Sequence, residues 1–164
     1  MTDLPTLLIV WHSRTGAAEA MARAAADAAA GEGAVSLLMA EEVQPDDLLG
    51  ADGYLFVCPE NLASMTGAMK ELFDRCYYPV LGLIEGRPYA LMVAAGSDGS
   101  GAVRQIERIA TGWRLKRIAD SLILCTHAQT AEQIAARKQL TDAELQPCRA
   151  LGTMFGAGLA MGVF

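Results

Sequence analysis

The fold is decided by residues 7–21, LLIVWHSRTGAAEAM. Five apolar residues lead directly into a histidine, a serine, an arginine, a threonine and a glycine, and an alanine-rich segment follows at once. A continuous apolar run of this length is typical of a strand that is buried on both faces of a parallel sheet. Alanine has the highest helix propensity of all residues. The stretch therefore predicts a strand over residues 7–11, a tight turn, and a helix over residues 16–30.

The rest of the chain repeats this alternation. Further apolar runs of strand length cover residues 35–39, 53–58, 89–95 and 121–125. Between and after them, apolar residues recur at helical spacing in three stripes: Met69, Leu72, Phe73 and Cys76; Val103, Ile106, Ala110 and Trp113; and Leu145, Cys148, Leu151, Phe155 and Leu159. Strands that alternate with helices predict an α/β fold with one doubly wound, five-stranded parallel sheet, and the last strand reads as uninterrupted.

Two capping boxes mark helix starts near the C-terminal end of the sequence. Thr141 and Glu144 have the spacing in which each residue's side chain bonds the other's backbone, so they predict the start of the last helix. A second pair, Thr130 and Gln133, indicates a short helix within residues 130–139. Two glycines in the last helix, at positions 152 and 156, predict that its backbone approaches the sheet closely.

Composition limits the classes of function. The 164 residues are 52% hydrophobic and 20% charged, which is enough for one core, so we expect a single domain over residues 1–164. A net charge of −6 argues against nucleic acid as a partner, because phosphate affinity depends on clustered Lys and Arg. The sequence has neither a signal-peptide pattern nor an apolar run of membrane-spanning length. We therefore expect a cytoplasmic protein that does not associate with membranes.

The four cysteines are widely spaced and form no CxxC pair or metal-ligand pattern. We expect them to be reduced and buried, where they pack as small apolar side chains. The two tryptophans, Trp11 and Trp113, are expected in the core. His12 and His127 each follow a strand, where a polar residue is ordinary, so neither is assigned a role in proton transfer.

Ligands of doubly wound sheets bind outside the carboxyl ends of the strands. This rule selects the loops at residues 11–16, 59–67 and 96–101. In the first loop, a helix N-terminus offers free amides and partial positive charge, the hydroxyls of Ser13 and Thr15 add donors, and a glycine lets the backbone come close. These features together predict a phosphate cradle. The alternative is that one of the two hydroxyls is only an ordinary N-cap.

The first loop resembles the phosphate loop of the flavodoxin-like FMN-binding family, whose pattern is S/T-x-T-G-x-T. The match is interrupted only at the last position, where an alanine replaces a hydroxyl and removes a contact of about 1 kcal/mol. The resemblance implies the strand order 2-1-3-4-5 and a bound FMN. It also implies that the phosphate contacts come from Ser13, Arg14, Thr15, Gly16, Ala17 and Ala18.

The second loop, within CPENLASMTGAMKELFDRCYYP at residues 58–79, is similar to the segment that meets the flavin edge in NAD(P)H-dependent FMN and quinone reductases. By this resemblance the flavin ring is lined by Pro59, Glu60, Asn61, Leu62, Ala63, Ser64 and Met65. The alternative is a polar connecting loop in which Asn and Ser form turns.

The third loop is rich in small residues, so a flat ring has access to bare backbone. In the family it closes the other side of the flavin, which implies contacts from Ala95, Gly96, Ser97, Asp98 and Gly99. Ser100 can at the same time be the N-cap of the next helix.

Two functions fit an FMN site of this kind. Neither residues 59–67 nor residues 96–101 contain an aromatic residue to cover the ring, and hydride transfer requires an open face. The resemblance therefore favours an oxidoreductase that passes electrons from NAD(P)H through FMN to a quinone, flavin or other small acceptor, and it suggests a homodimer. The alternatives are a short-chain flavodoxin-type electron carrier, which the acidic surface suits, and a regulatory protein that has lost FMN.

Overall fold

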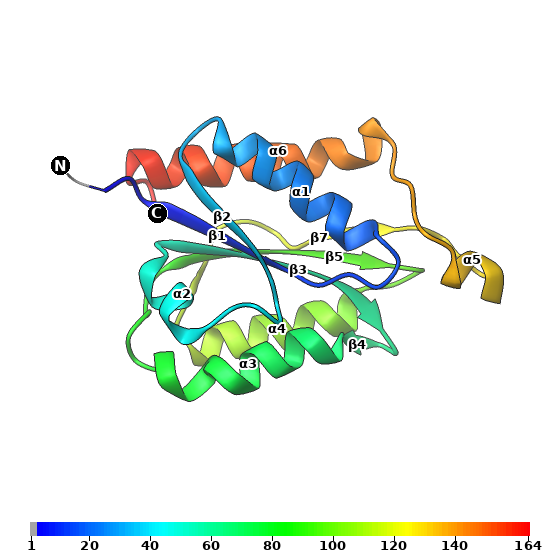
Figure 1. Ribbon diagram of the computed structural model, residues 1–164, viewed down its shortest axis with the longest axis horizontal. Coiled ribbons are helices and arrows are strands. Elements are labelled where there is room, and N and C mark those ends of the chain that lie inside the picture. Colours follow the sequence, from blue (N-terminus) through cyan, green and yellow to red (C-terminus); the bar gives the residue numbers. More distant parts are fainter. Residues whose placement is uncertain (1–2) are drawn as a thin grey trace.

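The computed structural model describes residues 3–164 as three layers, with a sheet between two sets of helices (Figure 1). One face of the sheet is covered by α1 (Ala17–Ala30) and α6 (Asp142–Met161). The other face is covered by α2 (Pro45–Gly50), α3 (Gly67–Val80) and α4 (Ser100–Gly112). The short helix α5 (Ala131–Ala135) projects beyond the carboxyl ends of the strands. The predicted α/β architecture is confirmed.

The first four parallel strands follow the predicted order. They are β2 (Ala34–Met39), β1 (Thr6–Trp11), β3 (Gly53–Asn61) and β5 (Pro88–Ala95), each hydrogen-bonded to the next. The expectation of an uninterrupted fifth strand is wrong, because two pieces, β6 (Lys116–Arg117) and β7 (Leu122–Cys125), both pair with β5. A short strand, β4 (Ser64–Met65), forms an antiparallel hairpin with the end of β3.

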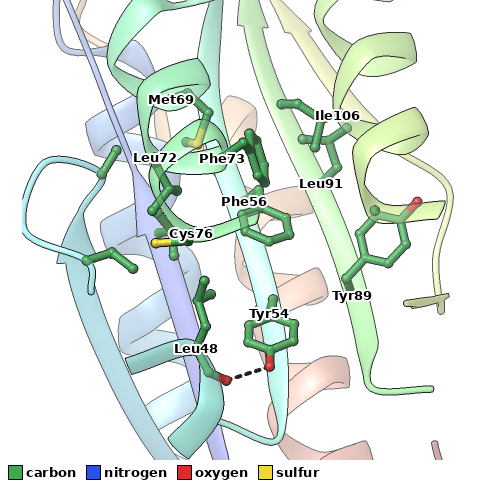
Figure 2. Packing of buried hydrophobic residues seen from close by; sticks show 14 of the residues in the cluster. Leu48, Tyr54, Phe56, Met69, Leu72, Phe73, Cys76, Tyr89, Leu91 and Ile106 are labelled. Atoms are coloured by element: carbon green, nitrogen blue, oxygen red, sulfur yellow. Dashed lines mark hydrogen bonds between the residues drawn. The ribbon is translucent and has the colours of Figure 1, made fainter. Parts of the chain in front are cut away.

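The strands are apolar throughout because both of their faces are covered. In β1, Leu8 and Val10 belong to the core under α3, while Leu7 and Ile9 belong to the core under α1. Figure 2 shows the first of these cores, where aromatic side chains of β3 meet the apolar stripe of α3. The rings of Phe56 and Phe73, for example, lie 5.2 Å apart between centroids. Burial of this apolar area is the main favourable contribution to folding.

One buried hydroxyl anchors a helix that the sequence did not predict. Helix α2 lies between β2 and β3, where the sequence patterns predicted no helix, and it begins with Pro45 after the Gln44 amide donates to the Asp47 carboxylate at 2.7 Å. The Tyr54 hydroxyl donates to the carbonyl of Leu48 in this helix at 2.6 Å, the bond dashed in Figure 2. Burial raises the pKa of Tyr54, so the hydroxyl stays protonated and keeps donating.

The predicted helix starts near the C-terminus are confirmed. Thr141 accepts from the Glu144 amide at 3.2 Å and its own amide donates to the Glu144 carboxylate at 2.8 Å. The same arrangement at Thr130 starts α5. The glycines of α6 serve a different purpose from the one expected: a Cβ at Gly152 would overlap the carbonyl oxygen of Ala25 in α1. The close approach is therefore between two helices, not between α6 and the sheet.

The tryptophans and three of the cysteines lie in the core as expected. Trp113 is fully buried and Trp11 is 8% exposed. Cys58, Cys76 and Cys148 are buried free thiols, whereas Cys125 is partly exposed, contrary to expectation. None of the helices within residues 3–164 is both long enough and apolar enough to cross a membrane.

Candidate functional site

A pocket opens at the carboxyl ends of β1, β3 and β5, where the predicted loops meet. Its cavity volume is about 170 Å³, and the empty space counted out to its open mouth is about 660 Å³. Its lining comes from four stretches of the chain: Ser13, Arg14, Thr15, Ala17 and Ala18; Pro59, Glu60 and Asn61; Ala94, Ala95 and Gly96; and Thr126, Ala128, Ile134 and Lys138. The first three stretches contain predicted site residues.

The start of α1 carries free backbone donors. Gly16 caps this helix with φ of +102°, a conformation that L side chains rarely adopt. Within residues 3–164, the amides of Ala17, Ala18 and Glu19 have no acceptor, since the first helical bond runs from Ala20 to Gly16. Three free amides and the positive end of the helix dipole make this point an anion site.

Two hydroxyls surround the same point. The Ser13 oxygen accepts from the Gly16 amide at 3.1 Å, which holds the turn closed. The Thr15 oxygen lies 3.4 Å from the Lys138 ammonium. Because both oxygens act as acceptors toward the chain, each hydroxyl keeps its hydrogen for another partner. The site therefore offers amide and hydroxyl donors together, which is the chemistry that a phosphate requires.

The second predicted loop is a hairpin, of which only the first half reaches the pocket. Pro59, Glu60 and Asn61 line it, whereas Leu62 and Ala63 form the tip with positive φ values of 53° and 61°. Leu62 is 92% exposed there. The other half, Ser64 and Met65, turns toward α4, where both residues hydrogen-bond the Gln105 side chain.

The third predicted loop is held by an internal carboxylate. Glu60 accepts hydrogen bonds from the amides of Gly99, Gly101 and Ala102 at 3.0, 2.9 and 3.2 Å. These amides form the N-terminus of α4, so the second helix end beside the pocket already has its anion. Of the residues predicted in this loop, Ala95 and Gly96 line the pocket, while Ser97, Asp98 and Gly99 do not.

The fourth stretch of the lining was missed by sequence reasoning. Thr126, Ala128, Ile134 and Lys138 follow β7 and reach the pocket because α5 projects past the strand ends. The only sequence signal there was the capping box at Thr130, which predicted a helix but not its position. Ala94 was also missed, since it reads only as part of the β5 apolar run.

His12 is near the pocket but does not line it. Its Nδ1 lies 2.8 Å from the hydroxyl of the fully buried Thr66, and its Nε2 lies 3.7 Å from the Glu41 carboxylate. Burial lowers the pKa of His12, against the opposing effect of Glu41. These contacts give His12 a structural role at the end of β1. Within residues 3–164 no group of His, Cys, Asp and Glu side chains forms a metal site.

Comparison with known proteins identifies the family. The family model of the NADPH-dependent FMN reductases matches residues 39–129, which is more than half of the chain. The chain belongs to the NADPH-dependent FMN reductase family. The match includes the second and third loops of this reductase-family protein, but it begins after the phosphate loop and ends before Lys138. Among curated proteins, none matches the sequence.

Solved structures share the fold of this family member. A flavodoxin from the domain Archaea superimposes with a TM-score of 0.76 at 18% identity, over 94% of this chain and 98% of the other. The flavodoxin of Streptococcus pneumoniae TIGR4 superimposes with a TM-score of 0.70 at 16% identity, over 90% of this chain and 94% of the other. A WrbA-like flavodoxin from Agrobacterium tumefaciens superimposes with a TM-score of 0.70 at 16% identity, over 96% of this chain and 98% of the other. At these identities the likeness shows a flavodoxin-like fold alone.

The residues present fit an FMN. The free amides of α1 and the two hydroxyls suit its phosphate, and Ala94, Ala95 and Gly96 provide a wall of small residues against which a flat ring can lie. Ala18 lies beside the free amides, so the missing hydroxyl removes one donor from a site that keeps several others.

Proposed function

We propose that the protein is an NAD(P)H-dependent oxidoreductase that holds FMN in this pocket and reduces a small acceptor such as a quinone or a free flavin. The observation that carries the proposal is the pairing of an open anion site at α1 with a pocket whose described lining contains no aromatic residue. A nicotinamide must stack on the flavin for hydride transfer. A ring without an aromatic cover leaves room for it.

The protein's part in this function is binding and positioning. The amides of α1, with Ser13 and Thr15, hold the phosphate end of the cofactor. The backbone of residues 59–61 faces the ring edge, and the Gln105 contacts with β4 keep this hairpin fixed. Glu60 fixes the third loop by bonding three of its amides. When bound, FMN supplies the chemistry, which is acceptance and release of two electrons with a proton.

A second candidate is a flavodoxin-type carrier that exchanges electrons with protein partners. It is favoured by the acidic balance of the chain, with a net charge of −6, because acidic surfaces steer basic redox partners. Such a carrier would bind FMN equally well but would not react with nicotinamide.

The test is an anaerobic absorbance experiment on the purified protein loaded with FMN. We expect NADPH or NADH to bleach the flavin absorbance near 450 nm within seconds, and a quinone added afterwards to restore it. If both nucleotides leave the bound flavin oxidised while chemical reduction succeeds, the carrier is correct and the reductase is not. If the folded protein retains no FMN in equilibrium dialysis, both candidates fail.

A further inference from the structure

A segment from the far end of the chain lies directly on the phosphate loop. Residues 136–138, here called the strap, begin the connection from α5 to α6, and the phosphate loop is residues 11–16. The Lys138 amide donates to the Thr15 carbonyl at 2.7 Å, although 123 positions separate the two residues. The strap therefore forms one wall of the anion site, and it lies outside the residues matched by the family model.

The Lys138 ammonium is held beside the donors of that site. It donates to the carbonyls of Gln133, Ile134 and Ala136 at 2.8, 3.0 and 2.6 Å, which close the end of α5. Its nitrogen also lies 3.4 Å from the Thr15 hydroxyl, and Lys138 lines the pocket. The charge is thus fixed in place by the backbone and partly shielded from water, where a charge acts more strongly than on an open surface.

Arg137 covers the outside of the phosphate loop. Its guanidinium carbon lies 3.2 Å from the point where a Cβ at Gly16 would stand. The same group is 3.7 Å from the Glu19 carboxylate and its side chain is 73% exposed, so solvent and an ion pair reduce its field. The exposed Arg14 is a further cation, and it lines the pocket together with Lys138. The acidic groups nearby are Glu19 and Glu60, and Glu60 is bonded to the α4 amides.

We propose that Lys138, with a smaller contribution from Arg137, is a phosphate-selective residue of this protein. The strap brings a fixed positive charge to the start of α1, and this charge favours the dianionic phosphate of FMN over the neutral hydroxyl of riboflavin. It also offsets the donor lost at Ala18. This inference depends on the proposed function, because it requires the FMN phosphate to occupy the α1 site.

The experiment compares the affinities of FMN and riboflavin by quenching of flavin fluorescence, for the wild type and the variants Lys138→Gln, Lys138→Arg and Arg137→Gln. Lys116→Gln serves as the control, because Lys116 is an exposed cation on β6 away from the pocket. We expect Lys138→Gln to weaken FMN binding about tenfold and riboflavin binding less than twofold, because the variant removes the Coulombic attraction between a fixed charge and the phosphate, which riboflavin lacks. Arg137→Gln should weaken FMN binding about threefold, and Lys138→Arg should restore most of the loss.

A second readout separates charge from structure. Between 20 and 500 mM NaCl the FMN affinity of the wild type should fall more steeply than that of Lys138→Gln, and riboflavin affinity should stay nearly constant in both. Equal losses for FMN and riboflavin in Lys138→Gln would show that the lysine only holds α5 and would overturn the proposal. Unchanged FMN affinity would overturn it as well. If the wild type binds neither flavin, it is the proposed function that fails.

Discussion

The conformation of Gly16 gives the sharpest test of the phosphate loop. This residue has φ of +102°, and an added Cβ would lie 3.2 Å from the Arg137 guanidinium carbon, closer than ordinary contacts. A left-handed backbone costs a non-glycine residue roughly 1–2 kcal/mol. For a chain of 164 residues, 1 kcal/mol corresponds to about 2–4 °C in Tm, so we expect Gly16→Ala to lower Tm by about 2–8 °C.

The matched control is the same substitution at the other end of α1. Gly31 has φ of −70°. A Cβ there would meet nothing closer than the Ala28 carbonyl at 3.5 Å. Gly31→Ala should therefore be neutral or stabilising by up to about 1 kcal/mol, because alanine restricts the unfolded chain more than glycine does.

The assay is thermal unfolding followed by circular dichroism, together with FMN titration of each variant. Gly16→Ala should also weaken FMN binding, since relief of the backbone strain turns the α1 amides away from their common point. Equal Tm values for Gly16→Ala and the wild type would refute the claim that this loop needs a left-handed glycine. A drop in Tm of similar size for Gly31→Ala would refute the assignment of that drop to backbone conformation.

Four further predictions concern the frame around the site. Glu60→Gln replaces charge-assisted bonds to three amides with a neutral acceptor, so we expect a loss of about 1–2 kcal/mol in urea unfolding; an unchanged midpoint would contradict the role of this carboxylate. Gly152→Ala should lower the free energy of unfolding by about 1–3 kcal/mol, because the new methyl group forces α6 away from α1. Gly50→Ala is the control and should not destabilise the protein, since a Cβ there has nothing within 4 Å. Calorimetric unfolding of the two variants tests this difference. Burial raises the pKa of Cys58 to about 12, so this thiol is protonated and unreactive at pH 8. A thiol reagent should therefore modify only the partly exposed Cys125 in the native protein, and the three buried cysteines should react only after unfolding. Since the Cys58 thiol holds its proton more tightly when folded, the free energy of unfolding should fall as pH rises above 9 toward 12, and a flat profile would count against it.

The sequence was most informative where a local pattern has a single physical reading. Continuous apolar runs predicted the strands because a sheet covered on both faces has no polar side, and the structure places Leu7 and Leu8 in opposite cores. The Thr141 capping box predicted a helix start because it depends only on residues three positions apart. The prediction of a phosphate loop has the same basis, since its glycine, hydroxyls and helix amides are consecutive.

Local patterns also failed in identifiable ways. Helix α2 was not predicted because a helix start marked by Gln44 and Asp47 is less distinctive than a cap made by Ser or Thr. The glycines of α6 were expected to face the sheet, and only the packing against Ala25 shows that they face α1. The hairpin between β3 and β4 divides the second loop, so that Asn61 lines the pocket and Ser64 does not.

The sequence alone therefore determined the class of fold and predicted the loop that would bind a phosphate, while its resemblance to the family implied the order of the first four strands. The fold class and the predicted loop depend on neighbours in the chain, or on a strand-end rule that holds for every sheet of this kind. Only the tertiary structure decided which of two helix ends is free for an anion, because Glu60 reaches the amides of α4 from 39 to 42 positions away. It also brought Lys138 to Thr15 across 123 positions. Contacts of that range leave no periodic trace in the sequence, since they arise from the path of the chain through space.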